Sequence, residues 1–267
     1  MPHSNSAAVV KPSARPTILA VETSSAYLSV AVMRGESVLA DATQRAERQH
    51  AMLLAGTIQE LVARAHLSLE TIDLLAVGIG PGSFAGLRIG VTTMKSLAMA
   101  LEKPVVGVSS LDAIAWNFVN DPRLVCPIVD AKRCQVYAAL YRMRRGRQQR
   151  LSEHLLEPVE RLLDRLQPDA GSALTAVADR CIVGRHESVV FVGDAVPLYA
   201  PVIRQRLNSR AALADESSGI PQASHIGCLA LRRWRAGERD DTDALGPLYL
   251  YPPPVTLRAP ATKGALG

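Results

Sequence analysis

Hydrophobic residues in the first half of the chain form short apolar runs that alternate with stretches of helical periodicity. The runs predict five strands, at residues 17–21, 28–33, 38–42, 74–79 and 105–108. Apolar positions three or four residues apart predict two helices, over residues 50–65 and 86–101. This alternation is typical of an α/β protein in which helices cover a mixed sheet.

The pattern of the first strands begins again after residue 120. An apolar run at 125–129 ends at Asp130 and leads through a polar turn to a predicted strand at 136–141. Earlier in the chain, the run at 17–21 ends at Glu22 and is also followed by a polar turn and a strand. The shared order of strand, carboxylate, turn and strand predicts a duplication. We expect a first lobe over residues 17–120 and a second lobe over 121–222.

The remaining segments give weaker signals. We expect a strand at 189–193, a helix at 198–207 and a loop-rich insertion at 167–185. Ser109 is expected to begin a capped helix, and Ser224 to cap another that ends before Gly237. Residues 223–251 should form a helix and strand segment whose helix packs back on the first lobe. Residues 1–16 and 252–267 are expected to be a disordered extension and a flexible tail.

Composition narrows the class of protein. Hydrophobic residues make up 48% of the 267 residues and aromatic residues only 4%, which predicts a large aliphatic core. The net charge of +5 and the pI near 9.2 permit nucleic-acid contact without requiring it. The four cysteines form no C-x-x-C pair, which favours a reduced, cytoplasmic protein. No apolar run is long enough to predict a membrane span.

A glycine-rich turn, Gly80-Pro81-Gly82-Ser83, joins the strand at 74–79 to the helix at 86–101. Backbone N–H groups at such a junction can bind an anion, but the same turn can form a tight structural loop. The segment does not match the Walker A spacing. It fits the looser G-x-G-x-x-A pattern but lacks an acidic residue at the end of the next strand. We therefore favour a structural or interface role over nucleotide binding.

Four segments together resemble the TsaB family of bacterial proteins. They read ILAVETSS at 18–25, GPGSFAGLRIG at 80–90, DAKRCQVYAALY at 130–141 and PLYLYPP at 247–253. The resemblance implies a two-lobed α/β duplication of the actin-like ATPase type (the ASKHA or RNase H-like fold). It also implies a non-catalytic partner that activates TsaD in the synthesis of N6-threonylcarbamoyladenosine in tRNA. A TsaE-like ATPase is expected in the complex, and a homodimer when the partner is absent. Ala85 stands where family members usually have Thr.

The resemblance also implies a partner surface on the two helices at 50–65 and 86–101. The residues expected at this interface are His50, Leu54, Gly80, Gly82, Gly86, Arg88, Ile89 and Thr93. TsaD carries an H-x-x-x-H metal motif on the first of these helices. Here Leu54 occupies the position of the second histidine, so His50 has no ligand partner one helical turn away and no metal site is expected.

Two other functions remain open from the residues alone. Glu22 and Asp130 are candidates to hold a Mg²⁺ nucleotide in the cleft between the lobes, as in a phosphotransferase or ATPase. Alternatively, they cap loops or form ion pairs with Lys132 or Arg133. The resemblance implies that this chain requires no cofactor, and that ATP or ADP with Mg²⁺ is bound, if at all, in the complex.

A cluster of arginines falls on a predicted hairpin turn around Gly146. Its members are Arg142, Arg144, Arg145, Arg147 and Arg150. Such a cluster can neutralise phosphates of tRNA, but it is also typical of a solvated turn. Few aromatic residues lie among the arginines for stacking on bases, so we favour the solvated turn and expect tRNA contact to be indirect or weak.

Overall fold

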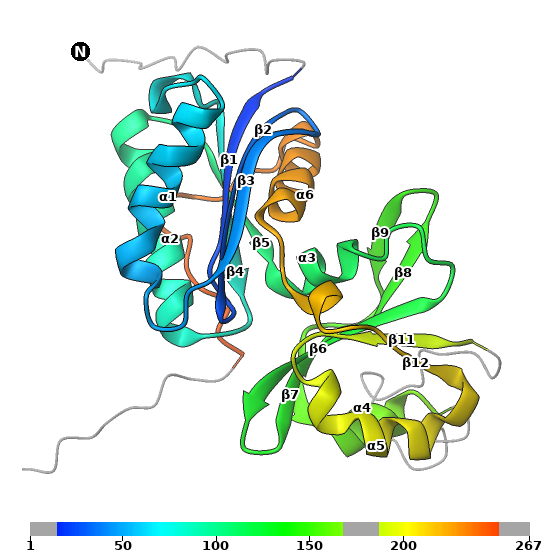
Figure 1. Ribbon diagram of the computed structural model, residues 1–267. Helices are drawn as coiled ribbons and strands as arrows, with labels where there is room; N and C mark the ends of the chain where they lie inside the picture. The colour runs from blue at the N-terminus through cyan, green and yellow to red at the C-terminus, as the bar shows by residue number, and fades with distance from the viewer. Residues whose placement is uncertain (1–14, 168–186, 251–267) are drawn as a thin grey trace, which may run out of the picture.

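The computed structural model describes residues 15–167 and 187–250. Most of the predicted N-terminal extension and loop-rich insertion, and all of the C-terminal tail, lie outside the described residues. Two lobes, each built on one sheet, lie side by side in Figure 1. No described helix is long and apolar enough to cross a membrane.

The first lobe contains a five-stranded mixed sheet in the order β3-β2-β1-β4-β5. Its strands are β1 (Thr17–Glu22), β2 (Tyr27–Arg34), β3 (Ser37–Arg45), β4 (Leu74–Gly80) and β5 (Val105–Ser109). β1, β2 and β3 form an antiparallel meander, whereas β4 and β5 run parallel to β1. All five strands predicted for this region are confirmed, and β3 extends beyond its predicted range.

Helices cover both faces of this sheet (Figure 1). On one face lie α1 (His50–Arg64) and α2 (Phe84–Leu101), and on the other lies α6 (Ala223–Arg235). Leu19 and Val21 of β1 belong to the core under α1 and α2, whereas Ile18 and Ala20 belong to the core under α6. Because both faces are buried, β1 is apolar at successive positions rather than alternating.

The second lobe repeats the order of the first. Its main strands are β6 (Leu124–Lys132), β7 (Gln135–Ala138), β10 (Leu155–Pro158), β11 (Val189–Val192) and β12 (Ala211–Leu213), arranged β10-β7-β6-β11-β12. α4 (Val159–Arg165) follows β10 as α1 follows β3, and α5 (Val196–Leu207) follows β11 as α2 follows β4. Short 3₁₀ turns lie at Leu69–Thr71, Asn208–Arg210 and Ser217–Gly219. The duplication and the fold class are confirmed.

One hairpin has no counterpart in the first lobe. β8 (Tyr141–Arg144) and β9 (Arg147–Arg150) are inserted between β7 and β10. The sequence predicted a single strand at 136–141, but the chain leaves β7 after Ala138 and pairs with the start of β6 from Tyr141. At the break, Leu140 N donates to Ser152 Oγ (3.0 Å) instead of continuing the ladder.

α3 (Ser110–Trp116) joins the lobes. Leu111 and Ile114 of this helix pack in one buried cluster with Val125 and Tyr141 of the second lobe. The Tyr141 hydroxyl donates to Asp112 Oδ1 (2.6 Å). α3 therefore covers the face of the second sheet that α4 and α5 leave open.

The C-terminal part of the described chain differs from the sequence prediction. α6 starts after Gln222, so Ser224 lies inside the helix, and Ala223 N instead donates to Ser29 Oγ of β2 (2.9 Å). Gly237 follows the helix end with φ +86°, as its sequence position predicted. Among the described residues 237–250 there is no strand, because Leu248 N makes a single bond to Ile79 O (2.7 Å) where a ladder would need several.

Candidate functional site

The turn between β1 and β2 lies against the glycine-rich loop and the first turn of α2. Ser83 N donates to Ser24 O (2.7 Å), and the Thr23 hydroxyl donates to Gly86 O (2.8 Å). Gly86 N and Leu87 N in turn donate to the side chain and carbonyl of Ser83 (3.3 and 2.9 Å). Three N–H groups at this junction, those of Ser83, Gly86 and Leu87, thus have partners inside the protein, which supports the structural role of this loop.

The glycines of the loop let the two segments approach closely. A Cβ at Gly82 would lie 2.3 Å from Ser24 O, and one at Gly86 would lie 2.0 Å from Thr23 O. Both distances are shorter than any side chain tolerates, so only glycine fits. Gly80 has a different reason, because its φ of +98° is a backbone conformation that favours glycine. These glycines fix the course of the loop.

Glu22 is fully buried at the end of β1. One carboxylate oxygen accepts from Ser24 N (2.6 Å) and the other from the Ser110 hydroxyl (2.7 Å). Burial raises the pKa of Glu22, and the hydrogen bonds from Ser110 and Ser24 oppose that rise. A Cβ at Gly78 would lie 2.1 Å from Glu22 Oε2, so this glycine makes the space for the carboxylate.

Asp130 holds the corresponding turn of the second lobe. Its Oδ1 accepts from Lys132 N (2.8 Å), as Glu22 accepts from the backbone two residues on, and its Oδ2 forms an ion pair with Lys132 Nζ (2.5 Å). Asp130 N donates to Asp194 Oδ1 (2.9 Å). From the residues alone, Glu22 and Asp130 could either hold a Mg²⁺ nucleotide or cap loops. The contacts that both side chains make are those of loop caps.

A cavity of about 220 Å³ separates the two lobes near the β1–β2 turn. Asp194 and Glu216 line it, whereas Glu22 and Asp130 do not. Burial raises the pKa of Asp194. The volume is below the range of about 300–1,000 Å³ typical of small-molecule sites. Within residues 15–167 and 187–250, no cluster of three or more His, Cys, Asp or Glu side chains is arranged to hold a metal ion.

Several residues predicted at the partner interface lie inside the first lobe. His50 is 5% exposed, and its Nε2 lies 3.3 Å from Tyr27 O, whereas Leu54 is 1% exposed in the core. Gly80 and Gly86 are also buried. His50, Leu54 and Gly86 lie on the core side of α1 and α2, and Gly80 is the last residue of β4, so the four offer little surface to a partner. Their place at the interface stays a prediction.

The other predicted interface residues remain accessible. Arg88 is exposed, and Gly82, Ile89 and Thr93 are half-buried. Arg88 packs over the ring of Phe84, with Cζ 4.1 Å from the centroid, and its Nε donates to the Tyr249 hydroxyl (3.4 Å). These contacts hold the Arg88 side chain at the start of α2.

The surface of α1 and α2 turned away from the sheet carries small and apolar residues. We call it the α1–α2 face, and its small and apolar exposed members are Met52, Ala55, Gly56, Ala63, Ala85, Thr92, Ser96 and Met99. Gln59, Glu60, Arg64 and Arg88 are also exposed on these two helices. Met52 is 78% exposed and Met99 63% exposed. A Cβ at Gly56 would meet nothing within 4 Å, so the fold itself does not require glycine there. Such a face lets another helix approach closely.

The duplicated sheets, the helices around them and the interlobe turns define a two-lobed protein of the actin-like ATPase fold class. A family model described as "TsaD: tRNA N6-adenosine threonylcarbamoyltransferase" matches residues 41–265. The chain belongs to this family.

Similar proteins carry the TsaB name or its equivalent. The chain is 29% identical over 234 residues to the tRNA threonylcarbamoyladenosine biosynthesis protein TsaB of Bacillus subtilis, covering 88% of this chain and 93% of that protein. It is 35% identical to Escherichia coli TsaB over 127 residues, which are 46% of this chain and 54% of that protein. The solved structure of YeaZ from Pseudomonas aeruginosa matches with a TM-score of 0.71 and 26% identity, covering 88% of this chain and all of that one. The resemblance to the TsaB family is confirmed.

Sequence reasoning missed the residues that complete these sites. Ser110 reaches Glu22 across 88 positions of the chain, and Asp194 reaches Asp130 across 64. Neither has a local pattern that marks it. Gly56 could have been noticed in the sequence. An isolated glycine inside a helical pattern lowers the stability of the helix, which indicates a packing or functional role.

Proposed function

We propose that this chain is a non-catalytic subunit that binds and activates a TsaD-like threonylcarbamoyl transferase in the formation of N6-threonylcarbamoyladenosine in tRNA. The role in this modification is supported by the family match and by the relatives named TsaB. The activator role and a cytoplasmic location are parts of the proposal.

The α1–α2 face carries this proposal. Many of its outward residues are small, and two exposed methionines offer flexible apolar surface to a partner. Glycine at position 56 costs the isolated helix about 1 kcal/mol relative to alanine, yet the fold leaves space for a larger residue there. A partner helix that packs over Gly56 would account for a glycine at this position. The same face would serve the homodimer when the partner is absent.

The proposal assigns any nucleotide and Mg²⁺ to the assembled complex and not to Glu22 or Asp130 of this chain. The supporting observation is that Glu22 is buried with both oxygens hydrogen-bonded, and that Asp130 is engaged by Lys132. ATP turnover by the purified chain, lost in Glu22→Ala, would contradict this assignment and favour the phosphotransferase or ATPase alternative.

The test is size-exclusion chromatography with light scattering, on this chain alone and mixed with the TsaD-like protein of its own organism. We expect a homodimer that converts to a heterodimer, with a TsaE-like ATPase able to join it. Thr93→Arg places a charge on the half-buried edge of the face and should abolish the heterodimer without unfolding the chain. Gln205→Arg adds the same charge to exposed α5 and serves as the matched control. A Thr93→Arg chain that still elutes with the partner would show that the surface assignment is wrong.

A further inference from the structure

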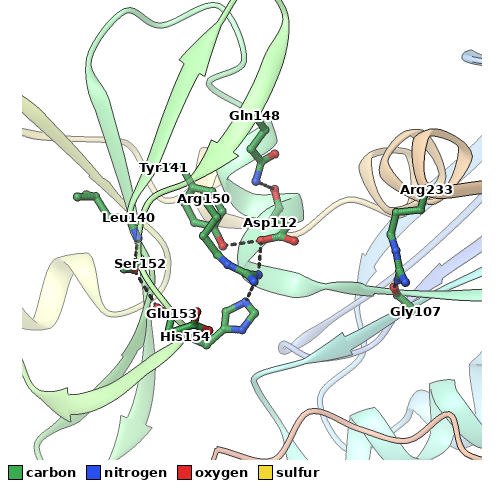
Figure 2. Close-up of polar contacts among 10 residues, drawn as sticks. All are labelled: Gly107, Asp112, Leu140, Tyr141, Gln148, Arg150, Ser152, Glu153, His154 and Arg233. Carbon is green, nitrogen blue, oxygen red and sulfur yellow. Dashed lines mark hydrogen bonds and ion pairs between the residues drawn. The ribbon is translucent and has the colours of Figure 1, made fainter. Parts of the chain in front are cut away.

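A groove rich in arginine runs between the β8–β9 hairpin and the C-terminal half of α6, with a volume of about 980 Å³. Its lining includes six arginines, which are Arg145, Arg147 and Arg150 of the hairpin segment and Arg232, Arg233 and Arg235 of α6. The carboxylates in the lining are Glu36 and Asp112. In Figure 2, Arg150 lies on the hairpin side and Arg233 on the α6 side, with Asp112 between them. Arg150, Arg233 and Arg235 form ion pairs with carboxylates in or beside the groove, whereas Arg145, Arg147 and Arg232 form none within residues 15–167 and 187–250, so the groove keeps an excess of positive charge.

Some of these arginines hold the walls of the groove in place. Arg150 donates toward His154 (3.0 Å) and lies 3.6 Å from Asp112, which ties the hairpin to α3 (Figure 2). On the other wall, Arg233 donates to Gly107 O (2.5 Å) and pairs with Asp240 (3.1 Å). The positions of both walls are thus fixed by internal contacts before any ligand arrives.

A further contact joins the two walls. Arg232 of α6 donates to Gly146 O at the hairpin turn (3.0 Å) and packs over the Trp116 ring, with Cζ 4.4 Å from the centroid. The hairpin, which the second lobe carries as an insertion, is therefore held against α6 of the first lobe. The groove is a feature of the two lobes together.

The arginines at the tip of the hairpin are different. Arg144, Arg145 and Arg147 are exposed, and none forms an ion pair within residues 15–167 and 187–250. They also line a second hollow of about 720 Å³, which shares Arg145 and Arg147 with the groove. Their charges are available to a ligand, and they extend the positive surface around the turn.

The wall of the groove also keeps unused hydrogen-bonding capacity. Ser109 and Gln148 border the groove, and their buried atoms Oγ and Oε1 have no hydrogen-bond partner among the residues that the structure describes. The sequence predicted that Ser109 caps α3, but its hydroxyl makes no capping bond. A buried polar atom without a partner costs about 1–3 kcal/mol. A ligand that offers both donors and acceptors, such as ribose hydroxyls beside phosphates, suits such a wall.

We propose that this groove binds the phosphate backbone of a folded RNA. A single phosphate would occupy one or two arginines, whereas the positive surface spans two adjoining hollows and belongs to two separate elements. That extent fits a ligand with many regularly spaced negative charges. The choice of RNA among such ligands rests on the proposed function. The inference that the groove binds a polyanion rests on its charge alone.

The test compares the full-length chain with two double variants. Arg145→Ser with Arg147→Ser removes two unpaired charges from the groove. Arg34→Ser with Arg204→Ser removes the same charge from exposed positions outside the groove lining and is the matched control. Binding of an unmodified tRNA transcript is followed by fluorescence anisotropy at salt concentrations from about 50 to 200 mM. Over this range, from about 50 to 200 mM, an affinity that depends on phosphate contacts falls steeply.

We expect the groove variant to bind the tRNA at least about 10-fold more weakly than wild type, and its salt slope to fall by about 1.4–1.8, because each phosphate contact contributes about 0.7–0.9. The control variant should keep most of the affinity. Equal affinity and slope in the groove variant and wild type would overturn the proposal. Competition by inorganic phosphate or ATP with an affinity equal to that of tRNA would also overturn it, in favour of a small phosphate ligand.

A second measurement separates this proposal from the proposed function. Both double variants should still form the heterodimer in light scattering, because the α1–α2 face lies on the opposite side of the first sheet from α6 (Figure 1). Salt-dependent tRNA binding through Arg145 and Arg147 without any TsaD-like heterodimer would sustain the groove and remove the activator role. A normal heterodimer, together with unaltered tRNA binding by the Arg145→Ser, Arg147→Ser variant, would sustain the activator role and overturn the groove.

Discussion

Replacing Gly56 should change the stability of the chain and its affinity for a partner in opposite directions. The residue lies in the middle of α1 on the exposed side, and an added Cβ meets no atom within 4 Å. Gly56→Ala should therefore add only helix propensity, which raises the free energy of unfolding by about 0.5–1 kcal/mol. For a chain of this size that gain corresponds to a Tm about 1–4 °C higher.

Gly56→Gln tests the other half of the argument. Glutamine is also a good helix former, so the chain should stay at least as stable as wild type. Its longer side chain would stand between α1 and a partner helix packed at the usual distance of about 8–10 Å. A steric conflict of about 1–3 kcal/mol weakens the heterodimer about 5- to 150-fold.

The assays are thermal unfolding of the free chain and titration of the TsaD-like protein by calorimetry. Gly237→Ala is a control with equally open space, but with φ +86° it should lower the Tm. A Gly56→Ala chain that melts below wild type would refute the helix argument. Unchanged affinity in Gly56→Gln would refute the interface.

Other predictions follow from the buried contacts. Gly86→Ala drives a methyl group onto Thr23 O and should lower the free energy of unfolding by at least about 1–3 kcal/mol in urea denaturation, and an unchanged midpoint would contradict the close contact. Because the pKa of Glu22 is raised, the folded chain binds the proton of this carboxyl group more tightly than the unfolded chain does. The stabilisation from protonated Glu22 is therefore fully present below the unfolded pKa. It is lost as the pH rises through the folded pKa. Glu22→Gln should therefore gain stability relative to wild type as the pH rises from the unfolded pKa through the folded pKa, measured by denaturant titrations. A difference that does not change with pH would refute the shift. Tyr141→Phe removes the bond to Asp112 between the lobes and should cost about 1–3 kcal/mol, read from the Tm, with no effect expected on far-UV circular dichroism.

The first lobe could be predicted closely because its elements are long or fully buried. β1 and β4 are apolar at nearly every position, since helices cover both faces of their sheet, and α1 and α2 are long enough to show a clear period. The duplication was also visible, because the strand, carboxylate and turn recur at the same spacing. These are local patterns that one sequence displays.

Shorter elements of the second lobe were not predictable in the same way. β10, α4 and β12 have only four, seven and three residues, which is too few for a period to stand out. The break between β7 and β8 depends on Ser152 accepting a backbone N–H from Leu140, a contact made by folding back of the chain. The Ser224 cap failed for a related reason, because Ser29 of the first lobe supplies the oxygen.

The candidate site was predictable in its location but not in its contacts. Sequence placed Arg88 and Thr93 on the correct helix, yet the helical period alone does not say which side of α1 faces the sheet at His50. The role of Glu22 depends on Ser110, and the groove depends on α6 arginines that lie more than 80 positions from the hairpin. Residues brought together only by the tertiary fold leave no trace in local spacing.

α3 gives the molecule a mechanical property. Proteins whose two lobes meet at a wet or polar boundary can turn about a hinge, but here Leu111, Ile114 and Tyr141 close that boundary with a shared apolar cluster. Turning one lobe against the other would expose this cluster to water. The exposure of this cluster opposes such a rotation, so the α1–α2 face and the arginine groove are restrained in their relative position by the packing of α3.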